Sequence, residues 1–450
     1  IMEFETKVEK TMELIRERYL NKEDDREHAI AWSGGKDSTA LLSLVINTLH
    51  EIPKEERTRT IQVVMSNTRV ENPVLESYMH SQVKLLKDYV KEWELPIKVN
   101  LVHRHVNDSY FVLTLGRGYF LPLNNGQGRW CTGRLKIKPQ DTILKEINPS
   151  YIYIGTRHGE SQNRSSSITK WSTSEFVGKH ATLTNSQTFM PVVNWSVEDI
   201  WEYLTADVLG WTDSIPVRRL YREATGECGL QSPKAMEEKL RLAKMESCGA
   251  RFGCWLCPVV ETDRSTEEMS DYHGWLEPLT HYREMQQFIY GSYTPPKIEG
   301  QKRKERSEAL RRQEAINEEI KRITKSGYNR KGTRMKNGQG TFTVEARKYL
   351  FDYLLDTEKA VNHLRKLEGL EPTRLIADDE IERIKELWEE DYKDYPFVIT
   401  NAENIPFDNV IPLLKGEIDD TLVENYKKEW REKQDARKKR KQQRKEDSNE

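Results

Sequence analysis

Long apolar runs are absent from this sequence of 450 residues, and cysteine is scarce in it. No stretch of 18 apolar residues occurs, so the sequence predicts no membrane-spanning helix and no membrane partner. Five cysteines are too few for a disulfide scaffold in a chain of this length. The first residues show no signal-peptide pattern, and we therefore expect a protein of the reducing cytoplasm.

A large net charge is also missing, but the near balance of charges conceals two basic segments. The net charge is −2 at neutral pH. Residues 297–336 contain 14 Lys or Arg against 6 Glu, and residues 427–445 contain 11 Lys or Arg against 3 acidic residues. Each segment has enough charge to contact several phosphates of a nucleic acid, and the alternative is a solvated flank.

The most informative stretch of the sequence is a loop with two glycines between an expected strand at 29–32 and an expected helix at 39–49. The glycines permit a tight turn, and the following backbone amides, together with the helix N-terminus, suit an anion. The pattern differs from the Walker loop, which is Gly-x-x-x-x-Gly-Lys-Ser/Thr. We expect phosphate binding by the loop residues Ser33, Gly34, Gly35, Lys36, Asp37 and Ser38.

Apolar segments recur along the N-terminal half at a spacing typical of βα units. They lie at 61–65, 97–102 and 151–154, and a helical pattern covers 74–90. This order predicts an α/β fold, in which a mostly parallel sheet is flanked by helices. In such a sheet the loops that follow the strands should converge on one crevice at the carboxyl ends of the strands.

Four ordered motifs resemble the ATP pyrophosphatase superfamily and its phosphoadenylylsulfate reductase branch. They are the glycine loop, residues 66–73, residues 155–164, and Arg129-Trp130-Cys131-Thr132 followed by Leu135, Lys136 and Pro139. With Trp195 and the helical pattern at 197–204, the likeness spans about residues 28–205. It implies an adenine nucleotide α-hydrolase-like fold that cleaves ATP between the α and β phosphates and uses AMP to activate an oxygen. Besides the loop, it implies phosphate-binding roles for Thr68, Gly155, Arg157, Glu160 and Arg164.

Charged residues in these motifs suit the chemistry of phosphates. Lys36, Arg157 and Arg164 would neutralise phosphate oxygens, the arginines through a bidentate fork. Asp37 offers a hard oxygen ligand for Mg²⁺ beside the phosphates. We therefore expect catalytic roles for Lys36 and Asp37. For Arg157, Glu160 and Arg164, the alternative is a surface cluster of ion pairs.

Four of the five cysteines lie within 30 residues of one another: Cys228, Cys248, Cys254 and Cys257. The Cys254-Trp-Leu-Cys257 spacing brings two thiolates within reach of one metal centre. Four thiolates suit either tetrahedral Zn²⁺ or an iron-sulfur cluster, and the spacing leaves this choice open. The third possibility is that the four cysteines are ordinary buried thiols that bind no metal.

The sequence around these cysteines is similar to the DndC family, the sulfurtransferases of bacterial DNA phosphorothioation, or to its counterpart in the Ssp systems. The similar segments are 227–228, 247–257, 259–260, 263–265, 293–295, 338–355 and 376–388. The resemblance implies a [4Fe-4S] cluster held by the four clustered cysteines. It also implies DNA, a cysteine desulfurase as sulfur donor and other phosphorothioation subunits as partners.

The function implied by this resemblance is ATP-dependent adenylylation of a DNA backbone phosphate, followed by sulfur incorporation with release of AMP and pyrophosphate. Cys131, outside the cysteine group, is a candidate catalytic nucleophile or sulfur carrier. A packed thiol at Cys131, or sulfide held by the cluster, are its alternatives. For the whole chain, the alternatives are a tRNA thiolation enzyme, a sulfonucleotide reductase and a non-enzymatic DNA-binding subunit that uses nucleotide.

These motifs predict five parts of the chain. They are an ATP pyrophosphatase nucleotide-binding domain at 1–225, an iron-sulfur cysteine region at 226–296, a basic insert at 297–337, a mainly helical region at 338–425 and a basic tail at 426–450.

Overall fold

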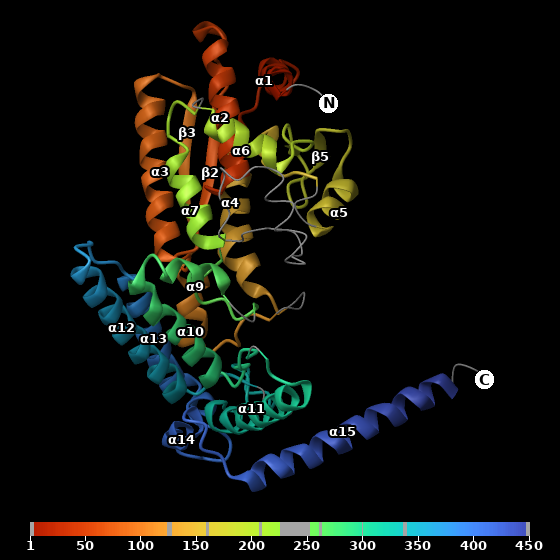
Figure 1. Ribbon diagram of the computed structural model, residues 1–450, viewed down its shortest axis with the longest axis vertical. Coiled ribbons are helices and arrows are strands. Elements are labelled where there is room, and N and C mark those ends of the chain that lie inside the picture. The colour runs from red at the N-terminus through yellow and green to blue at the C-terminus, as the bar shows by residue number, and fades with distance from the viewer. Residues whose placement is uncertain are drawn as a thin grey trace. The chain divides into compact units, whose positions relative to one another are not determined.

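The chain folds into two compact units, seen in a computed structural model (Figure 1). The residues described by the structure are 4–123, 128–158, 162–206, 209–225, 253–260, 263–298, 300–335 and 340–446. The first unit comprises Ile1–Ser109, Arg129–Trp255 and Asp263–Leu276, and the second comprises Tyr110–Gly128, Leu256–Thr262 and Glu277–Glu450. Both units therefore draw on segments that are far apart in the sequence.

A six-stranded sheet in the order β3-β2-β1-β4-β6-β5 forms the centre of the first unit. Its strands are β1 (His28–Ala31), β2 (Ile61–Asn67), β3 (Ile97–His103), β4 (Tyr151–Ile154), β5 (Val177–Lys179) and β6 (Gln187–Phe189). All neighbouring strands pair in parallel except β5, which pairs antiparallel with β6 at the edge. The predicted α/β fold with a mostly parallel sheet is confirmed. The short strands β5 and β6 were not predicted.

Helices cover the sheet and bury its apolar residues. Among the described residues, those of the first unit are α1 (Phe4–Leu20), α2 (Lys36–Glu51), α3 (Pro73–Glu92), α4 (Lys138–Ile147), α5 (Gln162–Trp171), α6 (Val197–Thr205), α7 (Ile215–Thr225) and α9 (Arg264–Ser270). Helix α2 packs against α1 and α6, and its residues Leu42, Leu44 and Val45 are fully buried. A helix that is apolar on most of its circumference is buried in a core. Because α2 is held in this way, it fixes the position of the loop that precedes it.

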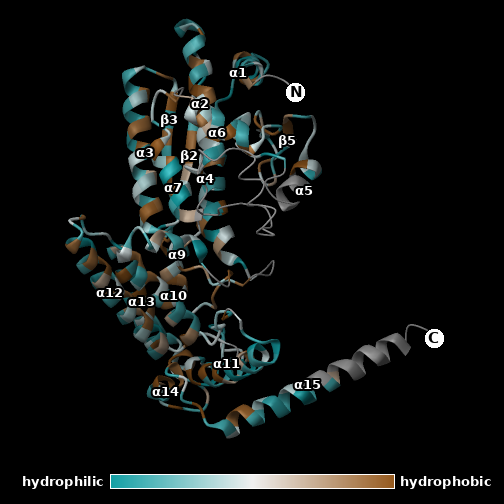
Figure 2. Ribbon diagram, viewed as in Figure 1, coloured by the Kyte–Doolittle hydropathy of each residue, from teal (hydrophilic) through white to brown (hydrophobic). Residues whose placement is uncertain are grey.

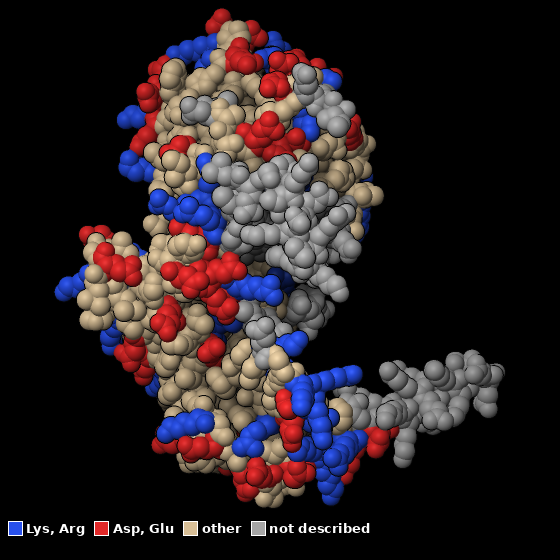
Figure 3. All heavy atoms as spheres, viewed as in Figure 1, with Lys and Arg blue, Asp and Glu red and all other residues tan. Residues whose placement is uncertain are grey.

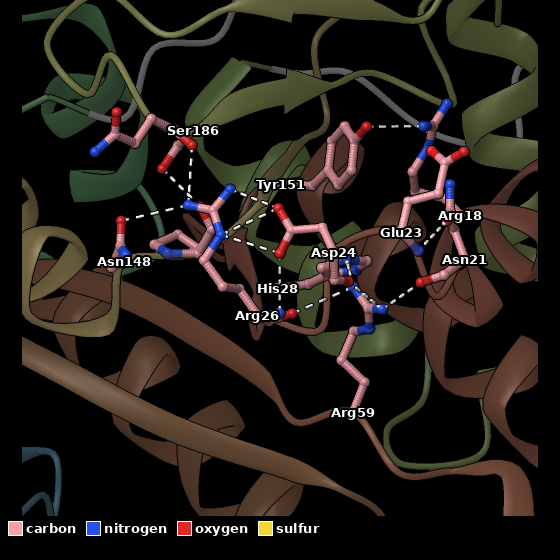
Figure 4. Close-up of polar contacts among 12 residues, drawn as sticks. Arg18, Asn21, Glu23, Asp24, Arg26, His28, Arg59, Asn148, Tyr151 and Ser186 are labelled. Carbon is pink, nitrogen blue, oxygen red and sulfur yellow. Dashed lines mark hydrogen bonds and ion pairs between the residues drawn. The ribbon is translucent and has the colours of Figure 1, made fainter.

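A polar network closes the amino edge of this sheet (Figure 4). Arg59 donates hydrogen bonds to Nε2 of His28, at 2.6 Å, and to the carbonyl oxygen of Asp24, at 2.7 Å. Nδ1 of His28 lies 2.9 Å from the hydroxyl oxygen of Tyr153. Burial and then the charge of Arg59 lower the pKa of His28 to about 3, so the ring is neutral at neutral pH. These hydrogen bonds fill the amino edge of the sheet. A ligand would therefore bind at the loops of the opposite, carboxyl edge, as ligands do in other open α/β sheets.

The second unit is mainly helical. Its α-helices in the described residues are α10 (Glu277–Ile289), α11 (Arg303–Thr324), α12 (Val344–Leu367), α13 (Asp378–Asp394), α14 (Val410–Leu414) and α15 (Asp420–Glu446). Helix α11 lies within the basic segment 297–336, and α13 covers most of the segment 376–388. An ion pair between Arg347 and Asp391 is fully buried in this unit, with 2.8 Å between Nη1 and Oδ2. Helix α11 shows hydrophilic and hydrophobic residues on different sides (Figure 2), as an amphipathic helix does.

None of the helices among the described residues is long and apolar enough to cross a membrane.

Candidate functional site

The glycine loop is folded as a tight turn between β1 and α2. Gly34 has φ +74°, a left-handed conformation that glycine adopts without strain. The hydroxyl oxygens of Ser33 and Ser38 lie 3.0 Å apart, and Ser38 donates to the carbonyl oxygen of Gly35 at 3.1 Å. Helix α2 starts at Lys36, so its first backbone amides point toward the loop. The strand-loop-helix geometry thus brings backbone amides and hydroxyls together, as an anion site requires, and phosphate binding by this loop stays a prediction.

The loop after β4 packs directly against this turn. Strands β1 and β4 are neighbours, with Ala31 opposite Ile154. A Cβ atom on Gly155 would lie 2.8 Å from the carbonyl oxygen of Asp37 and 2.9 Å from the backbone nitrogen of Ser38. Only a glycine allows the two loops to approach so closely, which gives Gly155 a packing role beside its predicted phosphate contact.

Three predicted charged residues meet at the start of α2. Arg157 forms an ion pair through Nε with Oδ1 of Asp37, and Nζ of Lys36 lies 3.8 Å from Oδ2 of Asp37. Lys36 and Arg157 are both only 5% exposed. Arg157 also donates to the carbonyl oxygen of Trp195 at 3.4 Å. Two buried cations around one carboxylate leave an excess of positive charge, which suits a phosphate.

Two tyrosines that the sequence did not reveal contact this loop. The hydroxyl oxygen of Tyr221, on α7, accepts a hydrogen bond from the backbone nitrogen of Lys36 at 3.2 Å. Nζ of Lys36 lies 4.6 Å from the centre of the Tyr221 ring, in cation–π range. Tyr78, on α3, donates to the carbonyl oxygen of Gly34 at 3.1 Å, and burial raises its pKa. Tyr221 is 185 residues from Lys36, so no local pattern could have identified it.

The loop after β2 brings a cysteine to the same edge of the sheet. The backbone of Thr68 donates to both carboxylate oxygens of Glu71, at 3.3 and 3.1 Å. Glu71 forms an antiparallel bridge with Cys254, and the backbone nitrogen of Trp255 donates to the carbonyl oxygen of Val70 at 3.2 Å. Oγ1 of Thr68 lies 4.0 Å from Sγ of Cys254. Because β2 neighbours β1 in parallel, this cysteine lies one strand away from the glycine loop.

Cys131 precedes the π-helix Thr132–Ile137 that leads into α4, and its side chain is partly buried. Helix α4 packs on β2 and β3 and leads into the parallel strand β4. A helix that connects parallel strands runs back along the sheet, so it starts at the carboxyl edge. Cys131 is therefore at the edge that holds the glycine loop.

Several predicted site residues lie outside the described part of the chain: Glu160, Cys228, Cys248 and the side chain of Arg164. Cys257 is described and partly buried, and it belongs to the second unit, where its carbonyl oxygen accepts from Nε of Arg283 at 2.9 Å. Among the described residues, no group of three His, Cys, Asp or Glu is arranged to hold a metal ion. The four-cysteine metal site therefore stays a prediction.

Comparisons with known proteins identify the family. Residues 27–260, more than half of the chain, match the phosphoadenosine phosphosulfate reductase domain. No curated protein matches.

Similar solved structures include FMN adenylyltransferase from Candida glabrata, with 14% identity and a TM-score of 0.31 over 50% of this chain and 64% of that chain. Another is phosphoadenylyl-sulfate reductase from Candida auris, with 11% identity and a TM-score of 0.30 over 46% and 84%. A third is the U34-tRNA thiolase NcsA from Methanococcus maripaludis with its [4Fe-4S] cluster, with 13% identity and a TM-score of 0.31 over 61% and 80%. On the domain match, this chain belongs to the phosphoadenosine phosphosulfate reductase domain family.

Proposed function

We propose that this protein is an ATP-dependent sulfurtransferase that activates a backbone phosphate of DNA and replaces one of its non-bridging oxygens with sulfur. The observation that carries the proposal is the position of Cys254, one strand away from the phosphate loop. The loop would bind the phosphates of ATP while the DNA phosphate is activated, and the cysteine would take part in the later transfer of sulfur. Their closeness would allow both steps to take place on one bound DNA substrate.

In the first step, an oxygen of the DNA phosphate attacks the α-phosphorus of ATP. The bond from that phosphorus to the bridging oxygen breaks, pyrophosphate leaves, and DNA carries an AMP group. The amides at the start of α2 and the ammonium of Lys36 would stabilise the charge that develops on pyrophosphate.

Asp37 would be the protein ligand of a magnesium ion in this step. Its Oδ1 pairs with Arg157, while its Oδ2 lies 3.8 Å from Nζ of Lys36. Mg²⁺ is commonly held by one or two carboxylates together with substrate phosphates, so a single carboxylate at the loop is an adequate protein ligand. Bound there, Mg²⁺ would neutralise phosphate charge.

In the second step, sulfur attacks the DNA phosphorus and AMP leaves with the oxygen. Activation is necessary because an unactivated phosphate oxygen is a poor leaving group. The sulfur would come as a persulfide from a cysteine desulfurase. With Cys131 as carrier, the outer sulfur would bond to the DNA phosphorus, and a reducing thiol would then break the sulfur–sulfur bond, form a disulfide with Cys131 and leave the phosphorothioate on DNA. With sulfide held by the cluster, a reducing thiol would release that sulfide from the persulfide before the transfer.

Cys228, Cys248, Cys254 and Cys257 would hold a [4Fe-4S] cluster. The described part of this set fits such a group, because Cys254 and Cys257 are partly exposed thiols that flank the buried residues Trp255 and Leu256. Apolar neighbours limit the access of water to a cluster, which would supply redox chemistry or a site for sulfide.

DNA binding is supported by the charge of the second unit. Lys and Arg side chains gather over α11, with acidic residues among them (Figure 3). The exposed basic residues at the start of α11 and on it include Lys302, Arg303, Lys304, Arg311 and Arg312. They provide a surface for backbone phosphates, beside the other phosphorothioation subunits that we propose as partners.

The test is mass spectrometry of nuclease-digested DNA and tRNA from cells that contain the protein and its operon partners. We expect sulfur-containing DNA dinucleotides that vanish with Lys36→Ala, and AMP with pyrophosphate as the products from ATP in the purified protein. ADP and orthophosphate as products would contradict the mechanism. Sulfur lost from tRNA instead of DNA would transfer the assignment to tRNA thiolation.

A further inference from the structure

Helix α7 brings Tyr221 to the glycine loop on its buried face. Val217, Leu220, Tyr221 and Ala224 recur at helical spacing, and each is at most 4% exposed. The ring of Trp201, on α6, meets the Tyr221 ring edge to face, with 5.4 Å between the ring centres. The orientation of the Tyr221 ring is therefore set by its own helix and by α6.

Another side of α7 is held as well. Glu223, two residues after Tyr221, is 6% exposed, and its Oε2 lies 2.9 Å from Nε2 of His273. His273 follows shortly after α9, which packs against α7. Contacts on different sides of the helix thus keep α7, and with it Tyr221, in place at the loop.

Tyr221 contacts Lys36 at both ends of that residue. Its hydroxyl oxygen accepts from the backbone nitrogen of Lys36, and its ring centre lies 4.6 Å from Nζ. The face of an aromatic ring is negative, so it attracts an ammonium that lies above it. Lys36 is only 5% exposed, and burial of an ammonium without a partner is costly. The ring is therefore a partner for this buried charge.

Asp37 alone does not fix this ammonium. Its Oδ2 lies 3.8 Å from Nζ of Lys36, beyond hydrogen-bond distance, and its Oδ1 already pairs with Arg157. Consecutive residues of a helix do not face each other, so α2 does not bring Lys36 and Asp37 into closer contact. Within the described part of the chain, Nζ of Lys36 makes no hydrogen bond, and the ring of Tyr221 therefore fixes the direction of this side chain.

We propose that Tyr221 is a positioning residue, whose ring holds the ammonium of Lys36 where it stabilises the departing pyrophosphate. A lysine side chain has several rotatable bonds, and ordering it only when the ligand binds would reduce the affinity by up to about 30-fold. The ring orders the side chain beforehand. This role rests on the proposed function, because it concerns the charge that develops on pyrophosphate. It belongs to the ring and is separate from the hydroxyl, which occupies a backbone amide.

The experiment changes the charge on the face of the ring and keeps its shape. The full-length protein is prepared as Tyr221→Phe and then with phenylalanines at position 221 that carry successively more ring fluorines, which withdraw electron density from the ring face. Pyrophosphate binding is measured by calorimetry across this series, and again across the same series combined with Lys36→Met. With Lys36 present, binding should weaken as fluorines are added, by about 5- to 30-fold in total. With Lys36→Met, the affinity should not change along the series, because the group that feels the ring is gone.

The matched control is the same fluorinated series at Tyr19. This tyrosine is also buried in the first unit, on α1, and its hydroxyl donates to the carbonyl oxygen of Arg59 in the network at the amino edge. Fluorines at position 19 should leave pyrophosphate binding unchanged. Thermal unfolding of each variant shows that the shape of the ring, and with it the fold, is kept.

Each other outcome has a defined meaning. An affinity that is constant along the series at position 221 would overturn the role of the ring. Tighter binding with more fluorines would also overturn it, because the ring would then compete with pyrophosphate for the ammonium. An equal decrease with Lys36→Met would assign the effect to the loop and not to Lys36, which again overturns the proposal.

The proposed function fails in a different way. If the series behaves as expected while ATP yields ADP and orthophosphate, or while sulfur is lost from tRNA instead of DNA, Tyr221 keeps its role at the loop and the proposed function fails. If the wild-type protein binds no pyrophosphate, both are overturned.

Discussion

Gly155 is the residue at which one added methyl group should disable the phosphate loop. In Gly155→Ala the new Cβ atom would lie 2.8 Å from the carbonyl oxygen of Asp37 and 2.9 Å from the backbone nitrogen of Ser38. Both contacts are backbone atoms in the first turn of α2. They cannot rotate away as the end of a flexible side chain could, so either the loop after β1 or the loop after β4 must move.

The size of the effect follows from this clash. Overpacking by one methyl group typically costs about 1–3 kcal/mol. For a domain of 150–250 residues, 1 kcal/mol shifts Tm by about 2–4 °C, so we expect Tm to fall by about 2–12 °C. Activity should fall further than stability, because a displacement of about 1 Å in an active site can reduce the rate about 100-fold.

The assay pairs thermal unfolding with the rate of AMP release from ATP. The matched control is Gly133→Ala, because a Cβ atom at Gly133 would have no neighbour within 4 Å. The control should keep its Tm or gain stability, by about 0.4–1 kcal/mol at most, through a less flexible unfolded chain. If Gly155→Ala unfolds at the wild-type temperature and releases AMP at the wild-type rate, the close approach of the two loops is not what holds the phosphate site.

Three further predictions concern Tyr221, the cysteines and His28. Tyr221→Phe removes the hydroxyl that accepts a hydrogen bond from the backbone amide of Lys36, which frees this amide for a ligand. Pyrophosphate measured by calorimetry should therefore bind about 2- to 10-fold more tightly, a factor equivalent to one hydrogen bond. Weaker binding would mean that the hydroxyl stabilises the bound state. Anaerobically purified protein should absorb at roughly 400 nm, as iron-sulfur clusters with thiolate ligands do. Cys254→Ser should abolish this absorption, and Cys131→Ser should leave it unchanged. Stoichiometric zinc without sulfide would refute the cluster. Because the folded-state pKa of His28 is lowered to about 3, its contribution to stability is complete above the unfolded-state pKa of about 6.5 and is lost as pH falls toward 3. At pH 5 this loss of stability is about 2 kcal/mol. The urea midpoint of the wild-type protein should therefore fall more between pH 7.5 and 5 than the midpoint of His28→Gln. Equal decreases in the two proteins would contradict the lowered pKa of His28.

The sequence by itself determined the local parts of this protein. Its apolar runs located four strands to within two residues at each end, and two glycines before a helical pattern located the turn between β1 and α2. Such features depend on backbone conformation and on which faces of a segment are apolar, and both are properties of neighbouring residues. The edge strands β5 and β6 were missed because three residues are too few to show an alternating pattern.

Only the tertiary structure decided which side chains meet at the site. Arg157 pairs with Asp37, Tyr221 covers Lys36, and Cys254 lies beside Thr68, although each pair is separated by more than 100 residues. The register of the parallel strands places the loops at one edge, and packing then selects the partners within it. Periodicity reports which residues are buried but not which residue each one contacts, and for that reason the sequence predicted a phosphate site without its tyrosines and a cysteine motif without its place at the end of β2.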